Sequence, residues 1–231
     1  MAVYQNPGRV FLRTLVCVVA LLFATTDFAQ AQGSDGRKQA RAVRVPNGSV
    51  RLDGQLEETA WSQAPPVTDF VQKEPAEGAS PTEAMEVRFV YDDSAIYVGA
   101  RMYSNNPQAI QAPMSRRDVV EQADYIRISL DTYLDRRTAY CFGVTASGVR
   151  LDHYHPRDSE GGEDQGFDPV WEARVTVDDE GWTAEMWIPF AQLRFTQQAE
   201  QVWGLNVHRW MPGRNEDDYW APVPRTVQGY A

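Results

Sequence analysis

Apolar and polar residues alternate over many short stretches of this 231-residue chain, a pattern that predicts β-strands. The clearest stretch is residues 182–188, where every second side chain is apolar: Trp182, Ala184, Met186 and Ile188. Residues 203–210 repeat the alternation with Trp203, Leu205 and Val207. A period of two indicates a strand with one buried face, so we expect both stretches to lie in a sheet that covers a core.

The same alternation divides the tryptophans between the two faces of these strands. Trp182 and Trp203 share the apolar positions, and we expect them in the core. Trp187 and Trp210 occupy the opposite positions, which we expect to face outward. Large aromatic side chains on the solvent side of a sheet are what a binding surface would need.

Further alternating or apolar stretches are separated by short turn-forming segments. The turns include Pro46-Asn47-Gly48, Asp92-Asp93-Ser94 and Ala146-Ser147-Gly148. The predicted strands are residues 84–91, 96–103, 125–132, 138–145, 149–154 and 170–178, with shorter extended pieces at 42–45, 50–52 and 67–72. Because no long amphipathic helix is evident, we expect an all-β protein: an antiparallel β-sandwich of the jelly-roll kind, with about eight to ten strands and short helical turns.

The first 31 residues have the pattern of a secretory signal peptide. Arg9 and Arg13 precede an apolar run at residues 14–24, and Ala29-Gln30-Ala31 has the small-x-small form of a cleavage site. We interpret residues 32–42 as a linker and 43–231 as the domain, and one interpretation of its end is that the domain is truncated there. The protein would therefore be exported, to the periplasm, the outer membrane or the medium. Cys141 would be the single cysteine after cleavage, and we interpret it as a packed thiol.

Charge argues against nucleic acid as a partner. The chain carries 22 Lys and Arg against 32 Asp and Glu, a formal net charge of -10, and no basic face is visible. Phosphate binding needs such a face. The sequence also lacks a nucleophile elbow, a phosphate loop and a His-Glu-x-x-His helix, and no pair of carboxylates is singled out for hydrolysis. We expect no catalysis by this chain alone.

Two kinds of metal site can be considered from the residues. Calcium prefers several carboxylate and carbonyl oxygens, and Asp92, Asp93, Asp131 and Asp135 are the candidates; aspartates in turns are more often turn formers. His153 and His155 lie on the same side of an extended segment. A transition metal would need a third ligand, and His208 is the one other histidine, so we do not expect such a site.

Several motifs occur in the order typical of one family. The first is Leu52-Asp53-Gly54-x-Leu56-x-Glu58-x-x-Trp61, the second Tyr91-Asp92-Asp93-x-x-Ile96-Tyr97-Val98-Gly99, and the third Trp182-Thr183-Ala184-Glu185-x-x-Ile188-Pro189-Phe190. These resemble family 9 carbohydrate-binding modules. Arg116-Arg117-Asp118, Asp168-Pro169-Val170-Trp171 and Trp220-Ala221-Pro222 resemble, more closely, the N-terminal domain of a group of exported bacterial proteins with a C-terminal region similar to an outer-membrane barrel.

The resemblance implies a DOMON-like β-sandwich that binds an oligo- or polysaccharide, often with structural calcium, and a connection to polysaccharide breakdown. Some modules of this type are parts of glycoside hydrolases and are described as hydrolases for that reason. Sugars stack on aromatic faces and hydrogen-bond to polar groups at the ring edge. The candidate binding residues are therefore Trp220, which the family's late loop tryptophan favours, with Trp210, Trp187, Arg101, Asn206 and Asp217. The alternatives are a structural domain that docks on a missing outer-membrane barrel region and a haem-binding module with Met114 or His208 as axial ligands.

Overall fold

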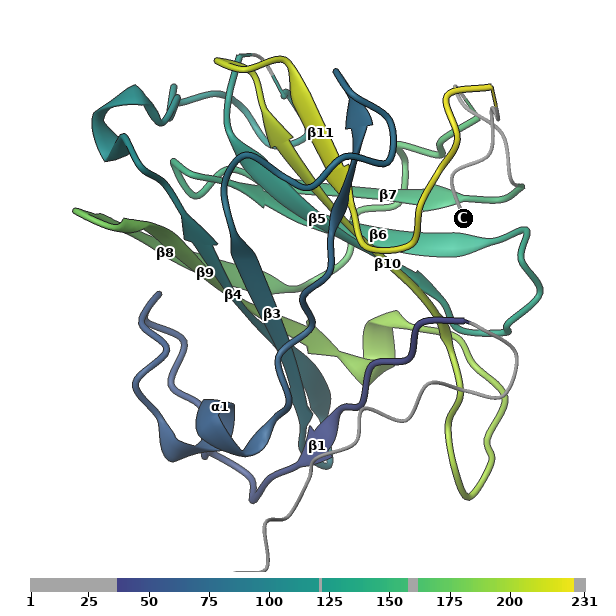
Figure 1. Cartoon of the computed structure of the whole chain (residues 1–231). Helices are drawn as coiled ribbons and strands as arrows, with labels where there is room; N and C mark the ends of the chain where they lie inside the picture. Colours follow the sequence, from purple (N-terminus) through teal and green to yellow (C-terminus); the bar gives the residue numbers. More distant parts are fainter. Residues whose placement is uncertain (1–36, 121, 158–161, 227–231) are drawn as a thin grey trace, which may run out of the picture. The chain divides into compact units, whose positions relative to one another are not determined.

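Two β-sheets form the body of the protein in the computed structural model, which describes residues 37–120, 122–157 and 162–226 (Figure 1). The expected signal peptide at 1–31 and the first part of the expected linker lie outside these residues. The first sheet has five strands in the order β1 (Val43–Arg44), β3 (Met85–Tyr91), β4 (Ala95–Tyr103), β9 (Gly181–Pro189) and β8 (Glu172–Asp178).

The second sheet has six strands. Their order is β2 (Val71–Glu74), β11 (Glu216–Tyr219), β10 (Gly204–Met211), β5 (Tyr125–Asp131), β6 (Ala139–Thr145) and β7 (Arg150–His155). Every pairing between these strands is antiparallel except that of β1 with β3. The helices are short: α1 (Thr59–Gln63), η1 (Pro107–Ala109) and η2 (Phe190–Gln192). The predicted all-β sandwich is confirmed.

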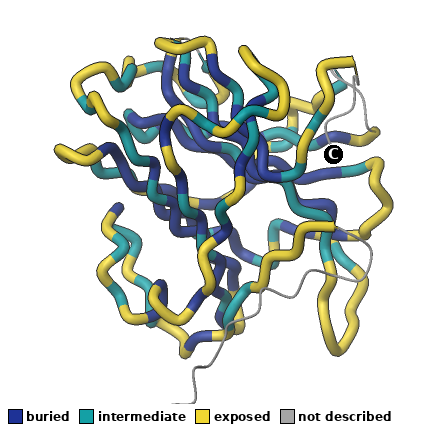
Figure 2. Tube along the Cα trace, in the orientation of Figure 1, coloured by how far each residue is buried: buried dark blue, intermediate teal, exposed yellow. Residues whose placement is uncertain are grey.

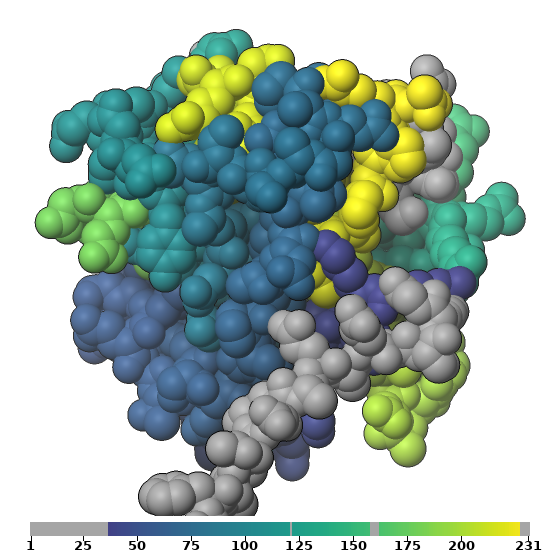
Figure 3. Space-filling view, viewed as in Figure 1, coloured from purple at the N-terminus to yellow at the C-terminus, as the bar shows by residue number. Residues whose placement is uncertain are grey.

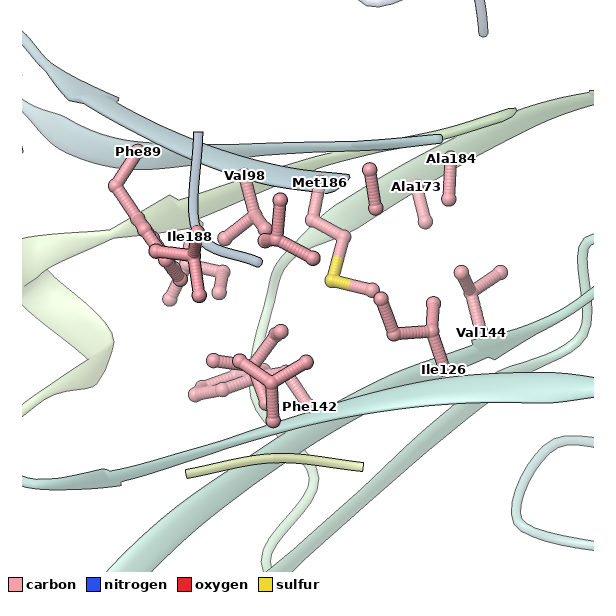
Figure 4. Close-up of a cluster of buried hydrophobic side chains, with 14 of the residues drawn as sticks. Phe89, Val98, Ile126, Phe142, Val144, Ala173, Ala184, Met186 and Ile188 are labelled. Carbon is pink, nitrogen blue, oxygen red and sulfur yellow. The ribbon is translucent and has the colours of Figure 1, made fainter. Parts of the chain in front are cut away.

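The core lies between the two sheets, where the alternating apolar positions meet. Met186 of β9 extends from the five-stranded sheet toward Ile126 of β5, and Phe142 and Val144 of β6 approach from the six-stranded sheet (Figure 4). Trp182 is fully buried in this cluster, as its position in the alternation predicted. Such burial contributes on the order of 25 cal/mol per Å² of apolar surface and is the main force that holds the sheets together.

The outer face of the five-stranded sheet is covered, contrary to the expectation that it faces solvent. The segment of residues 43–64, including α1, packs on it and forms a second apolar cluster with Val45, Trp61, Val90 and Tyr97. Trp187 is half-buried against this cluster rather than open to a ligand. Strand β9 is consequently buried on both faces. In Figure 2 the dark blue tube at the centre marks the buried residues of the sheet interior.

Within the described residues, none of the helices has the length and apolar content needed to cross a bilayer. The part of the chain that the structure describes consists of strands, loops and three short helical segments.

Candidate functional site

Glu185 anchors the segment that covers the five-stranded sheet. Its carboxylate accepts hydrogen bonds from the backbone N–H groups of Asp53 and Gly54, at 2.8 and 2.7 Å, and from Nε1 of Trp61 at 3.1 Å. Glu185 has no exposed surface. Burial raises its pKa to about 6, and the nearby carboxylate of Glu58 adds to the rise. We call Gly54, Trp61, Gly99 and Glu185 the latch.

Glycine at positions 54 and 99 makes the latch possible. Gly54 has a φ of +86°, and a Cβ there would lie 2.9 Å from Thr176 Oγ1. A Cβ at Gly99 would lie 2.8 Å from the Trp61 ring. Both distances are too short for real contacts, so only glycine fits. The motifs that carry the family resemblance therefore meet at one place and fasten the N-terminal segment.

A second set of motif residues meets at Asp152 of β7. Its Oδ1 accepts hydrogen bonds from Nε1 of Trp171 and Nε of Arg117, both at 2.9 Å, and Asp118 accepts from its backbone N–H at 2.8 Å. Arg117 also pairs with Asp168 at 2.5 Å. Burial raises the pKa of Asp152, against the lowering effect of Trp171 and Arg117. These motif residues also have a structural role.

The outer face of the six-stranded sheet is different, because aromatic and charged side chains gather there. His208 of β10 stacks on Tyr219 of β11, with ring centroids 4.4 Å apart and planes 4° apart, and Tyr125 of β5 meets His208 edge-on at 5.2 Å. Arg127 lies over Tyr125 and Lys73 over Tyr219, at 5.1 and 5.8 Å from the ring centroids. We call this the aromatic face.

Trp210 is the large aromatic side chain of this face that reaches its surface. The backbone register places Trp210 beside Tyr125 on one side and Asp217 on the other. Tyr125, His208 and Tyr219 are buried, whereas Trp210, Arg127 and Asp217 are half-buried. Asp217 also pairs with Nε2 of His208, and burial nonetheless lowers the pKa of that histidine. The surface therefore presents one indole with a carboxylate and a guanidinium close by.

A shallow cleft of about 160 Å³ lies at the β2–β11 edge of the same sheet. Its lining combines polar and apolar side chains, including Gln72, Lys73, Glu77, Tyr219 and Pro222. In Figure 3 the blue atoms of the loop after β2 lie against the yellow atoms of the C-terminal segment, which form the two walls. Because pockets for drug-sized ligands measure roughly 300–1,000 Å³, this cleft has room for only a small group.

The structure brings some predicted binding residues together and separates others. Trp210, Asp217 and Asn206 lie on β10 and β11 of the six-stranded sheet. Trp187 and Arg101 lie on the five-stranded sheet, where Arg101 forms a two-point ion pair with Asp178 at 2.6 and 2.8 Å. The six residues therefore do not form one site.

Trp220, which the resemblance favoured for sugar stacking, is only 6% exposed and belongs to the central core cluster. Its backbone N–H donates to the carbonyl of Val207 at 3.0 Å. Asn206 holds the next residue, with hydrogen bonds to both N–H and C=O of Ala221, at 2.9 and 3.1 Å. The indole is thus turned into the core and has no open face for a sugar.

The four candidate calcium aspartates accept hydrogen bonds from protein donors. Asp92 accepts from Ser94, Ala95 and Tyr97, and Asp93 pairs with Arg44 and Asn47. Asp131 accepts from two backbone N–H groups of the following turn, and Asp135 from two more. These four side chains act as turn formers and do not fit a preformed calcium cage. Calcium binding stays a prediction.

The two residues named for the haem alternative lie in different surroundings, one exposed and one buried. Met114 is 81% exposed in the loop before β5, and His208 is buried between Tyr125 and Tyr219. His208 also uses Nε2 to bind Asp217, so an axial role would require that contact to break.

One cluster was missed from the sequence: Cys141 of β6 lies beside His153 and His155 of β7. Burial raises the pKa of the Cys141 thiol to about 11, while burial and the charge of Arg127 lower that of His153 to about 3. The spacing of twelve residues between Cys141 and His153 resembles no familiar ligand motif. The antiparallel pairing of β6 with β7, once predicted, was the signal that could have joined them.

The sequence comparison decides the family. The model of the carbohydrate family 9 binding domain-like family matches residues 52–218. The chain belongs to this family. The match begins at Leu52 and ends within β11, so it includes every strand except β1 and the last residue of β11, and it includes the aromatic face except Tyr219. No curated protein matches the chain's sequence.

Solved structures of similar fold include members of family 9. One is a family 9 carbohydrate-binding module from Caldicellulosiruptor kristjanssonii in complex with cellotriose, with TM-score 0.54 and 16% identity over 78% of this chain and 84% of that one. A glucose complex from the same organism gives TM-score 0.50 and 16% identity over 78% and 85%. A candidate carbohydrate-binding protein from Bacteroides uniformis gives TM-score 0.56 and 12% identity over 82% and 93%. At these identities the likeness establishes the shared fold of the family 9 domain.

Proposed function

We propose that this family 9 domain binds carbohydrate with the aromatic face, around Trp210. Two facts support the ligand class: the family to which the chain belongs, and the cellotriose and glucose held by structures of the same fold. The observation that carries the location is the difference between the two sheets. Residues 43–64 cover one outer face, while the other presents Trp210.

Sugar rings bind proteins through two kinds of contact, and this face offers both. The C–H side of a pyranose packs on a flat aromatic ring, which Trp210 supplies. Hydroxyls at the ring edge bind charged groups well, because hydrogen bonds with an ionised partner are roughly twice as strong as neutral ones. Asp217 lies directly opposite Trp210 and would act as the acceptor. Arg127 lies over the ring of Tyr125, the neighbour of Trp210 on β5, and would act as the donor.

The cleft at the β2–β11 edge extends the proposed site. Lys73 and Glu77 on its wall supply a donor and an acceptor for a second sugar unit. A short β-linked glucan could then contact Trp210 with one unit and the cleft with another. The finer proposals are that the chain is exported through its first 31 residues, and that saccharide binding serves polysaccharide breakdown outside the cytoplasm.

Isothermal titration with glucose, cello-oligosaccharides and xylan tests the proposal. We expect heat of binding with at least one of them, and a loss of at least about tenfold in affinity for Trp210→Ala, which is ~1.4 kcal/mol. Tyr133→Ala is the matched control, because Tyr133 is an aromatic residue, 50% exposed, in the turn after β5 and away from Trp210. Binding to no saccharide would overturn the ligand class. Binding that survives Trp210→Ala would overturn the location.

A further inference from the structure

We propose that Cys141, His153 and His155 form a binding site for a transition-metal ion of the zinc and copper type. This site is separate from the proposed saccharide function and does not rest on it. The three residues are one of two groups within the described residues whose side chains could hold a metal, the other being the carboxylates of Asp53, Glu58 and Glu185. The latch already uses that second group, since Glu185 accepts three hydrogen bonds.

The sheet itself brings the three side chains together. Cys141 of β6 pairs with His153 of β7 in the antiparallel register, so both point to the same outer face. His155 lies two residues further along β7 and returns to that face. Sequence distance is irrelevant here, because neighbouring strands place directly opposed side chains about 5 Å apart.

The distances between the ligand atoms suit a bound ion. Nε2 of His153 lies 3.1 Å from Nε2 of His155, with the rings nearly perpendicular at 81°. Two nitrogens that each lie about 2.0–2.1 Å from a tetrahedral zinc ion are separated by about 3.3 Å. Ligand atoms of all three residues lie within 4.8 Å of one another, so small side-chain shifts would bring the sulfur into range.

The type of ligand narrows the choice of metal. A thiolate with two imidazoles is a soft donor set that zinc and copper ions accept, whereas calcium and magnesium require oxygen. Cys141 and His155 are fully buried, and His153 is half-buried, so an ion would enter past His153. Ser129 of β5 lies 3.3 Å from the sulfur and would orient it as an outer partner.

The charged residues around the cluster are of both signs. The positive charge of Arg127 on β5 lowers the pKa of both Cys141 and His153. The negative charge of Glu163 raises the pKa of Cys141. A deprotonated Cys141 would offset part of the guanidinium charge. Monovalent copper with one thiolate would add no net charge, and divalent zinc would add one. Because Glu163 and Arg127 act on the cluster with opposite signs, these charges do not select one ion, and both stay in the proposed class.

Metal titration tests the proposal in a Cys17→Ser background, where Cys141 is the sole thiol. Metal-free protein receives cobalt(II), whose thiolate complexes absorb through sulfur-to-metal charge transfer, and then zinc(II) or copper(I) as competitors. We expect one cobalt ion per chain, displacement by both competitors and a rise in Tm with zinc. Cys141→Ser and His153→Gln should each weaken binding by more than about 100-fold, since even outer partners of metal ligands contribute 10–100-fold.

His208→Gln is the matched control, because His208 is a buried histidine on the same sheet outside the cluster. The affinity of this variant for cobalt(II) should equal that of the parent protein. Each variant's Tm without metal identifies a folding defect. If Cys141→Ser does not fold, His153→Gln at its half-buried position decides the question. No charge-transfer band and no Tm shift, or binding that persists in both ligand variants, would overturn the proposal.

Discussion

The backbone N–H of Gly54 lies 2.7 Å from the Glu185 carboxylate, although 131 residues separate them in the chain. This contact fixes the N-terminal segment on β9 and closes the outer face of the five-stranded sheet. Trp61 completes the arrangement from α1, with its ring over Gly99. The most family-like motifs of the chain therefore stabilise the fold, and the saccharide site that we propose lies on the other sheet.

Glu185→Gln should destabilise the protein by about 1–3 kcal/mol. The carboxylate accepts three hydrogen bonds, whereas an amide offers one oxygen and turns its NH₂ toward a remaining donor. Urea unfolding at neutral pH measures the loss. Glu172→Gln is the control, because that carboxylate lies on neighbouring β8 and is half exposed. Equal stability of the two variants would contradict the latch.

The contribution of Glu185 to the stability of the protein should fall as the pH rises from about 4.5 to about 6, while the lowered pKa of His153 acts in the opposite direction. Burial raises the folded-state pKa of Glu185 from 4.5 to about 6, so within this window the folded state binds a proton that the unfolded state has lost. The contribution of Glu185 to the free energy of unfolding therefore decreases with pH, by about 2 kcal/mol for a shift of this size, and the difference between the parent protein and Glu185→Gln isolates it. Denaturant midpoints across the window measure it, and Glu185→Gln should remove this contribution. An unchanged slope in that variant would assign the pH dependence to other groups.

Gly99→Ala should destabilise the protein by about 1–3 kcal/mol, because the added methyl group would overlap the Trp61 ring. Gly48→Ala is the comparison: its Cβ would meet no atom within 4 Å, so the cost there comes from its φ of +77° alone. The double variant Gly99→Ala with Trp61→Leu should recover part of the loss, since leucine leaves room. Thermal melts of the three variants measure the effect. No recovery in the double variant would show that Trp61 is not the obstacle.

Arg117→Ala should cost about 3 kcal/mol or more, because it leaves the carboxylate of Asp152 buried without its cation. Arg174→Ala provides the contrast. Its pair with Glu172 is half exposed on both sides and should contribute no more than about 1 kcal/mol. Chemical denaturation separates the two outcomes, and similar costs would contradict the importance of the Asp152 site.

Trp220→Ala should mainly reduce the stability of the protein, and Trp210→Ala should mainly reduce its binding of saccharide. Trp220 is in the core, so its loss should lower stability by about 3–5 kcal/mol. Trp210 is half-buried on the aromatic face, and its loss should affect saccharide binding more than folding. Titration calorimetry with parallel melting curves measures both. A stable Trp220→Ala variant without saccharide binding would return the sugar contact to Trp220.

Much of the architecture followed from local pattern. Residues 84–91 and 96–103 were predicted within one residue of β3 and β4, because a period of two and an Asp-Asp-Ser turn are local signals. The same pattern correctly predicted that Trp182 is buried. It was wrong about the surroundings of Trp187, since alternation distinguishes two faces of a strand but not which face another segment covers.

The sequence by itself determined the β-sandwich, the position of most strands and the inward set of side chains, because strand periodicity and turn residues act over a few positions. Only the tertiary structure decided that Glu185 binds the Asp53-Gly54 turn, that Trp220 is buried, and that Cys141 meets His153 and His155. These contacts join residues 12 to 132 positions apart in the chain. Strand order and the return of the N-terminal segment create them, and no local pattern encodes either.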